Sequence, residues 1–243
     1  MLISQRTNVL HKPINTMRPY NFFKPLTVIL TSAVLLLSSA TVQDKQDEKI
    51  QDATSVLTDF GKMHESIPHE LLEHTQGIII IPKLINAGLV VGGKRGKGIA
   101  MVKDANGHWS NPVFVTMTGG SFGFQVGVQS IDLVLIFKNR ETLTNIGKGS
   151  FTLGGDISVA AGPVGRNSTA NTDYKLEAEV YSYSRSRGLF AGISLNGAAL
   201  AIDKKADAAF YNNDEGAKAI FMSSKSDLGP VKELKETLKS LYQ

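Results

Sequence analysis

The chain has 243 residues, of which 42% are hydrophobic, a proportion that suits a globular protein and is too low for a polytopic membrane protein. It contains no cysteine, which excludes disulfides, thiol catalysis and cysteine-ligated zinc or iron–sulfur centres. The formal charge of +4 comes from residues 1–40, which carry four basic residues and no acidic one. Residues 41–243 hold 22 basic and 22 acidic residues, so we expect no nucleic-acid partner.

Residues 1–40 have the pattern of a secretory signal peptide. Lys24 precedes an uncharged run with the apolar core 26–37, and the small residues 38–40 follow it. This core is shorter than the ~20 residues that a membrane-spanning helix usually needs. We therefore expect an exported protein of the periplasm or cell envelope. A start at Met17 would give a signal of ordinary length, and an uncleaved N-terminal anchor is the alternative.

Residues 41–66 are predicted to form an amphipathic helix, because Ile50, Ala53, Leu57 and Phe60 recur at intervals of three and four. The polar face of this helix mixes acidic and basic residues, whereas a membrane-surface helix is rich in Lys and Arg. We therefore expect the apolar stripe to pack against the domain that follows.

A β-rich region with abundant glycine follows, and 20 of the 23 glycines lie between Gly77 and Gly197. Glycine weakens ordinary strands, so its abundance indicates sharp bends or the close approach of another backbone or a ligand. Short helices are expected at 69–75 and 140–146, and a loop at 163–172. The periodicity predicts strands at 78–81, 88–94, 98–103, 112–118, 122–128, 132–138, 150–161, 174–184 and 188–195.

The C-terminal part returns to a helical pattern. Short helices are expected at 206–210 and 215–222, and 212–243 is taken as a C-terminal helical segment. Its last helix begins at Pro230 and carries an apolar stripe at Val231, Leu234, Leu238 and Leu241. The order of elements predicts an α+β fold. Its sheet would be strongly bent and mostly antiparallel, or a small barrel, flanked by N- and C-terminal helices.

Several segments resemble catalytic or ligand-binding motifs but lack a residue or a spacing that the motif requires. Gly88–Lys94 has the spacing of a phosphate-binding loop, but Arg95 stands where Ser or Thr would bind magnesium. His69 and His74 are five residues apart, whereas zinc-binding histidines on one helix face are four apart. No nucleophile, base and orienting group come together in the sequence. We therefore expect a protein that is not an enzyme, with no metal site and no cofactor.

Two longer motifs are specific, Trp109-Ser-Asn-Pro112 and Tyr183-Ser-Arg-Ser-Arg-Gly-Leu-Phe-Ala-Gly192. With the glycine-rich stretches 92–98 and 119–127, they make residues 67–211 resemble the SYLF domain. This is a lipid-binding module of eukaryotic actin-patch and endocytic proteins, and it also occurs in exported bacterial proteins. The resemblance implies non-enzymatic binding of acidic phospholipid or phosphoinositide headgroups at a membrane surface.

The predicted lipid-binding residues are the cations near the glycines, which are Lys94, Arg95, Lys97, Arg185 and Arg187. The first three are expected in a turn, where exposed amides and cations can meet one phosphate group. The alternative is that both clusters are charged, solvated turns.

The expected partner is therefore an anionic phospholipid membrane. Actin is not expected as a partner, because an exported bacterial protein would not meet it, and the sequence identifies no protein partner. The alternative function is a structural or protein-interaction module of the envelope without specific lipid binding.

Overall fold

The computed structural model describes residues 23–63, 67–88, 91–122, 127–162, 178–186, 189–190, 193–226 and 228–241. The chain divides into two compact units, Met1–Ser39 and Ala40–Gln243. Helix α1, Phe23–Lys62, contributes residues to both units. No helix of the described residues is long and apolar enough to cross a membrane. The first 22 residues of the expected signal peptide lie outside the described residues, so export stays a prediction.

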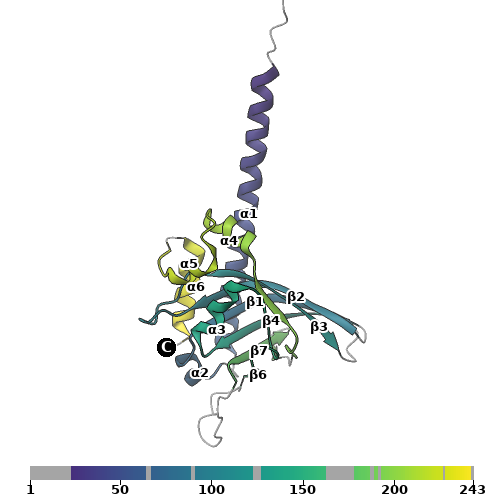
Figure 1. The fold of residues 1–243 in the computed structure, drawn as a ribbon, viewed down its shortest axis with the longest axis vertical. Coiled ribbons are helices and arrows are strands. Elements are labelled where there is room, and N and C mark those ends of the chain that lie inside the picture. The colour runs from purple at the N-terminus through teal and green to yellow at the C-terminus, as the bar shows by residue number, and fades with distance from the viewer. Residues whose placement is uncertain are drawn as a thin grey trace, which may run out of the picture. The chain divides into compact units, whose positions relative to one another are not determined.

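A curled mixed sheet forms the centre of the second unit (Figure 1). The described residues give it nine strands in the order β5-β9-β3-β2-β1-β4-β7-β6, with β8 paired to β7. All of these pairs are antiparallel except β6 with β7. The strands are β1 Gly77–Gly88, β2 Val91–Val102, β3 Val113–Phe122, β4 Gly127–Phe137, β5 Phe151–Thr152, β6 Val159–Ala161, β7 Val180–Ser186, β8 Leu189–Phe190 and β9 Ala199–Ile202.

Short helices accompany α1 around this sheet, and the predicted α+β fold with helices before and after the strands is confirmed. Asp203 and Asn139 cap two of these helices by accepting hydrogen bonds from the main-chain N–H groups of Ala206 and Glu141. The remaining helices are α2 His69–Glu73, α3 Arg140–Thr144, the 3₁₀ helix η1 Asn145–Lys148, α4 Lys204–Tyr211, α5 Gly216–Met222 and α6 Gly229–Ser240.

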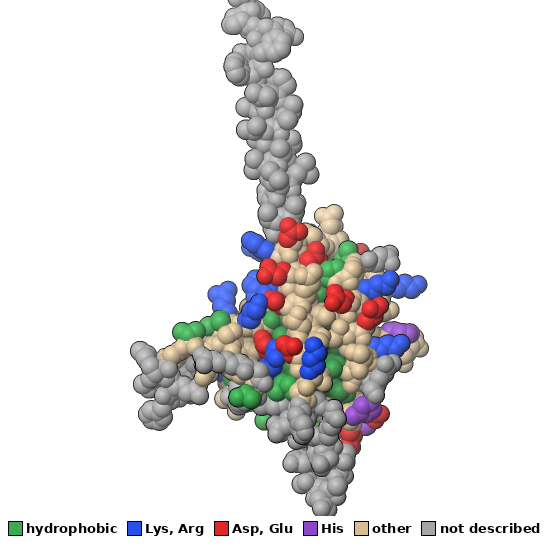
Figure 2. Space-filling model, turned by 180° about the vertical axis from the view of Figure 1, so that it is seen from behind, with side chains coloured by type: hydrophobic (Ala, Val, Ile, Leu, Met, Phe, Trp, Pro, Cys, Tyr) green, Lys and Arg blue, Asp and Glu red, His purple; other side chains and the backbone are tan. Residues whose placement is uncertain are grey.

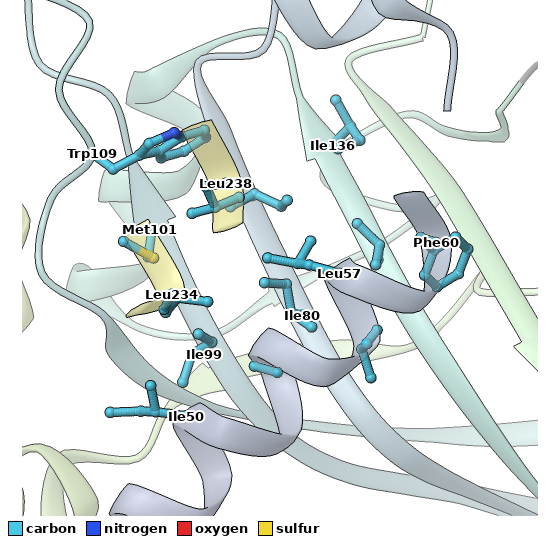
Figure 3. Packing of buried hydrophobic residues seen from close by; sticks show 14 of the residues in the cluster. Ile50, Leu57, Phe60, Ile80, Ile99, Met101, Trp109, Ile136, Leu234 and Leu238 are labelled. Carbon is cyan, nitrogen blue, oxygen red and sulfur yellow. The ribbon is translucent and has the colours of Figure 1, made fainter. Parts of the chain in front are cut away.

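Strand β1 is buried on both faces, because alternate side chains enter two separate hydrophobic clusters. Ile78 and Ile80 lie on the side covered by α1 and α6, where they join Leu57 and Leu234 (Figure 3). Ile79 and Ile81 lie on the opposite side, in the cluster that includes the buried residues of α3 and α5. This burial on both faces explains the unbroken apolar run, and it confirms that the apolar stripe of the N-terminal helix packs against the domain.

Three local predictions are wrong. The single strand expected at 150–161 is two short strands, β5 and β6, which lie at opposite ends of the sheet order. The chain was expected to leave the strand at Pro82, but β1 continues to Gly88 through an irregularity in its pairing with both neighbours. Lys83 has a φ of 53° at this point, and proline is tolerated in such a bulge because the ladder there needs no N–H group. The expected turn at 94–97 does not exist, because β2 runs without a break through it.

At one end the sheet extends past the helices that cover it. Four paired strand ends form this extension, which we call the glycine arm (Figure 1). The glycine arm consists of residues 85–88, 91–97, 118–122 and 127–130. Its strands pair directly through small residues, as in Gly88 with Gly92 and Gly88 with Gly127. Much of the glycine block therefore belongs to this exposed end of the sheet.

Gly98 lies where the irregular part of β1 approaches β2. A Cβ atom at this position would lie 2.0 Å from the carbonyl oxygen of Ile80 and 2.8 Å from the Cα of Ile81. Main-chain atoms cannot turn aside as a flexible side chain can, so this position requires glycine. Gly93, in the same strand, would place a Cβ 3.7 Å from the nearest atom, the Gly119 carbonyl oxygen.

We therefore predict that Gly98→Ala lowers the free energy of unfolding by about 1–3 kcal/mol through overpacking. The matched variant Gly93→Ala should change it by less than about 0.5 kcal/mol, because the new methyl group meets its nearest atom only at ordinary van der Waals distance. Urea unfolding followed by circular dichroism measures both. Equal stability of the two variants would contradict the close approach at Gly98.

Candidate functional site

The three cations predicted to form one cluster lie on opposite faces of the sheet. Successive side chains of β2 alternate, so Lys94 points to one face and Arg95 and Lys97 to the other. Lys94 is 5% exposed, its Nζ donates a hydrogen bond to the main-chain carbonyl of Ser194, and burial lowers its pKa. The structure therefore separates Lys94 from the other two cations.

Arg95 and Lys97 are both exposed on the side of the sheet that α1 covers further along. The Nζ of Lys97 lies 2.7 Å from Oδ2 of Asp203, the residue that caps α4. Arg95 forms no ion pair with any residue that the structure describes. Of these two, Arg95 is thus the cation that remains open to an external anion.

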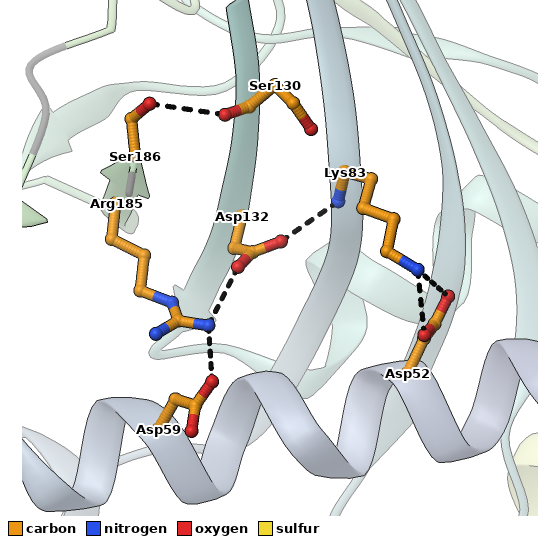
Figure 4. A network of polar contacts seen from close by, with 7 residues as sticks. All are labelled: Asp52, Asp59, Lys83, Ser130, Asp132, Arg185 and Ser186. Atoms are coloured by element: carbon orange, nitrogen blue, oxygen red, sulfur yellow. Dashed lines mark hydrogen bonds and ion pairs between the residues drawn. The ribbon is translucent and has the colours of Figure 1, made fainter. Parts of the chain in front are cut away.

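Arg185 lies in an ionic network between α1 and the sheet (Figure 4). Its Nη2 donates to Oδ2 of Asp59 at 2.6 Å and to Oδ2 of Asp132 at 2.9 Å. Oδ1 of Asp132 accepts a hydrogen bond from the main-chain N–H of Lys83 at 3.0 Å. The Nζ of Lys83 in turn lies 3.1 Å from both carboxylate oxygens of Asp52. The network therefore joins α1 to β1, β4 and β7.

The side chain of Arg185 is only 14% exposed, and its guanidinium lies 5.7 Å from the centroid of the Phe60 ring. Two carboxylates and an aromatic ring hold this guanidinium, and its Nε is buried without a hydrogen-bond partner, so burial leaves a phosphate little access to it. Arg187 lies outside the described residues. The lipid-binding role of all five cations stays a prediction, and of the four that the structure describes, Arg95 is exposed and has no ion pair among the described residues.

A group of exposed apolar side chains, which the sequence analysis did not single out, lies on the same face as Arg95. Ile85 is 42% exposed, Val91 66% and Val128 72%. The strand register places them on one side, because Ile85 pairs with Arg95, Ala87 pairs with Val128, and Val91 lies four residues, an even number, from Arg95 along β2. We call this surface the apolar arm face, and Figure 2 shows hydrophobic side chains exposed along the projecting arm.

The opposite face of the glycine arm is polar. Gln129, Asn86 and Lys94 are direct partners in one row across β4, β1 and β2. The alternation of Val91, Gly93, Arg95 and Lys97 with smaller or buried residues is the signal that could have revealed the two faces. It is missed when residues 94–97 are interpreted as a turn.

One of the two specific sequence motifs, at 109–112, makes contacts that stabilise the fold. Trp109 is buried, and Ser110 Oγ accepts a hydrogen bond from the main-chain N–H of Val102 at 3.0 Å. The side chain of Asn111 donates to the carbonyl oxygen of Lys225 and accepts a hydrogen bond from Nζ of Lys235 at 2.7 Å. These contacts fasten the loop between β2 and β3 to α6 and to the segment before it.

Asp207 is the buried acid of the described chain that lacks a full set of partners. It is 4% exposed, Oδ1 accepts from the main-chain N–H of Phe114 at 2.8 Å, and Oδ2 has no partner. Burial, opposed by that hydrogen bond and assisted by the charge of Asp203, raises its pKa to about 7. No group of metal-ligating residues gathers around it or elsewhere in the described residues. Asp207 thus serves to dock α4 on β3.

We predict that Asp207 makes the protein less stable as pH rises from about 4 to about 7. The unfolded carboxyl has a pKa of about 3.9, so in this range the folded state binds more protons than the unfolded state. The loss can reach about 4 kcal/mol and should level off above pH 7. Melting temperatures measured from pH 5 to pH 8 should fall in the wild type and change less in Asp207→Asn. The exposed control Asp214→Asn should follow the wild type, and a parallel fall in all three proteins would contradict this assignment.

We also predict that Arg185→Ala lowers the free energy of unfolding by about 2–3 kcal/mol, because two carboxylates lose their cation at a mostly buried position. Asp59→Ala should cost less, since the Asp59 side chain is 45% exposed and its charge is screened by water. The exposed control Lys232→Ala should leave urea unfolding unchanged. A fully stable Arg185→Ala protein would show that the contacts of Arg185 with Asp59 and Asp132 contribute nothing to stability.

Comparison with known proteins agrees with the sequence motifs. The profile of the Ysc84 family, described as Las17-binding protein actin regulator, matches residues 118–241. SH3 domain-containing YSC84-like protein 1 of Bos taurus is 33% identical over 207 residues, which cover 85% of this chain and 60% of that protein. LAS seventeen-binding protein 3 of Saccharomyces cerevisiae is 33% identical over 177 residues, which cover 69% of this chain and 38% of that protein. The matched region is thus only part of these longer relatives, but the match confirms the predicted resemblance, and the chain belongs to the Ysc84 family.

Proposed function

We propose that the protein binds acidic phospholipid or phosphoinositide headgroups at a membrane surface, without catalysis, and that the apolar arm face is its contact with the membrane. One observation carries the proposal. Ile85, Val91 and Val128 are exposed on the same face of the glycine arm as Arg95. Exposed apolar side chains beside an accessible cation suit the interface of an anionic bilayer.

Apolar contact supplies the larger share of the binding free energy in this proposal. Burying a Val or Ile side chain is worth roughly 1.5–3 kcal/mol, so the three partly exposed residues together offer on the order of 3–5 kcal/mol. A cation near an anionic membrane adds about 1 kcal/mol. Lys97 contributes less than Arg95 because Asp203 already neutralises it.

The family supports this proposal in general terms, since the resemblance to the SYLF domain implies lipid binding. The export signal expected at residues 1–40 would place the protein in the periplasm or envelope, where anionic phospholipids would be the ligand. Lipid binding by the family and export of this chain are both expectations from the sequence, and they are consistent with a membrane contact at the glycine arm.

The test is sedimentation with phosphatidylcholine vesicles that contain about 30% phosphatidylglycerol. It uses Ala40–Gln243, which holds both hydrophobic clusters and lacks the apolar run at 26–37, after cooperative thermal unfolding has been verified. Val91→Ser with Val128→Ser should weaken binding about tenfold or more, by loss of apolar contact. Arg95→Ala should weaken it about fivefold.

Matched controls lie elsewhere on the surface. Met222→Ser removes an apolar side chain that is 70% exposed, and Lys232→Ala removes an exposed cation. Both controls should bind like the wild type. If the arm variants also bind like the wild type, the apolar arm face is not the membrane contact.

A protein-interaction module is the second candidate, and the names of the relatives favour it, since one is named for binding Las17 and the family is described as an actin regulator. Removing residues 41–66 would not test this candidate, because Ile50, Leu57 and Phe60 of that segment are part of the core. Failure of the wild type to bind any vesicle would favour this candidate over membrane binding. The expectation that actin is not a partner stays a prediction.

A further inference from the structure

The apolar arm face has a composition unlike that of a surface built to read headgroup charge. Between its aliphatic residues lie small side chains, which the strand register places on the same face. These are Ala87, Gly93, Thr118, Gly120 and Ser130. None of them can reach out to a phosphate group, as a lysine or arginine would.

The cations near this face add little to it. Lys94 points to the other face and is buried, and Lys97 is held 2.7 Å from Asp203. Arg95 is therefore the single exposed arm cation without an ion pair among the residues that the structure describes. Attraction by charge alone would bring the protein near an anionic surface but would hold it weakly.

The aliphatic side chains also reach only a short way. Val91 and Val128 are exposed by 66% and 72%, yet each extends only a branched pair of methyl groups from a paired strand. Neighbouring strands lie about 4.8 Å apart, so the arm presents a rigid ribbon rather than a deep wedge. To bury these side chains, the acyl chains of the bilayer must already be accessible between the headgroups.

We infer that the apolar arm face recognises loosely packed or strongly curved membranes, where acyl chains are exposed between the headgroups. This inference rests on the proposed membrane contact and specifies the state of the membrane that it prefers. Amphipathic helices that bury apolar area at the membrane interface bind with an affinity that depends on curvature and lipid composition, and the same argument applies to an exposed apolar face of a sheet. Headgroup charge then affects how readily the protein approaches a membrane more than which membrane it prefers.

The experiment compares vesicles of one composition, phosphatidylcholine with about 30% phosphatidylglycerol, at diameters of about 30 nm and about 200 nm. At equal accessible lipid, Ala40–Gln243 should bind the small vesicles about fivefold or more tightly than the large ones. Replacing unsaturated acyl chains by saturated ones at fixed diameter should weaken binding in the same direction. Val91→Ser with Val128→Ser should remove the dependence of binding on vesicle diameter. Arg95→Ala should weaken binding at both diameters, but the preference for small vesicles should remain.

The outcomes separate the two proposals. Equal binding to small and large vesicles would overturn the inference about packing and leave the membrane contact standing. A dependence on diameter that persists in the Val91 and Val128 double variant would place the sensing surface elsewhere and overturn the inference as well. Absence of binding to every vesicle would remove the membrane contact and the inference together.

Discussion

The burial of β1 on both faces is the constraint on which the rest of the unit depends. Four consecutive isoleucines, 78–81, direct side chains into two clusters, so each face of the sheet must be covered by other elements. Helices α1 and α6 supply the cover on one side, and α3 and α5 supply residues on the other. The cover ends near Leu84, while the strands continue, and the glycine arm is the uncovered remainder of the same sheet.

The irregularity at Pro82 and Lys83 connects the covered part of the sheet to the arm. Proline removes a main-chain donor, and the neighbouring N–H of Lys83 is satisfied by the Asp132 carboxylate instead of a partner strand. The same distortion directs the Lys83 amine to Asp52 of α1 and brings the Ile80 carbonyl close to Gly98. One departure from regular pairing therefore explains the need for glycine at position 98 and part of the ionic network.

The patterns that depend on local periodicity were predictable, and those that depend on pairing across the chain were not. The helix with Ile50, Leu57 and Phe60 was expected to pack on the domain, and it does, because its apolar spacing permits no other buried face. Strand β9 was not predicted, since Ala199–Ile202 is short and gains its hydrogen bonds only from β3 and β5. The three carboxylates that Arg185 and Lys83 contact come from segments far from them in sequence, so no spacing rule could join them.

The candidate site was misread for a related reason. Lys94, Arg95 and Lys97 look like one basic cluster in the sequence, but a continuous strand gives neighbours opposite surroundings. Lys94 fastens the loop at Ser194 against one face of the arm, where burial lowers its pKa. That contact lies on the face of the arm opposite Arg95. The face with Val91, Val128 and Arg95 is exposed to solvent. Lys97, Arg185 and the motif at 109–112 are engaged in contacts within the fold, and the proposed membrane contact therefore lies on the face of the sheet that the fold leaves uncovered.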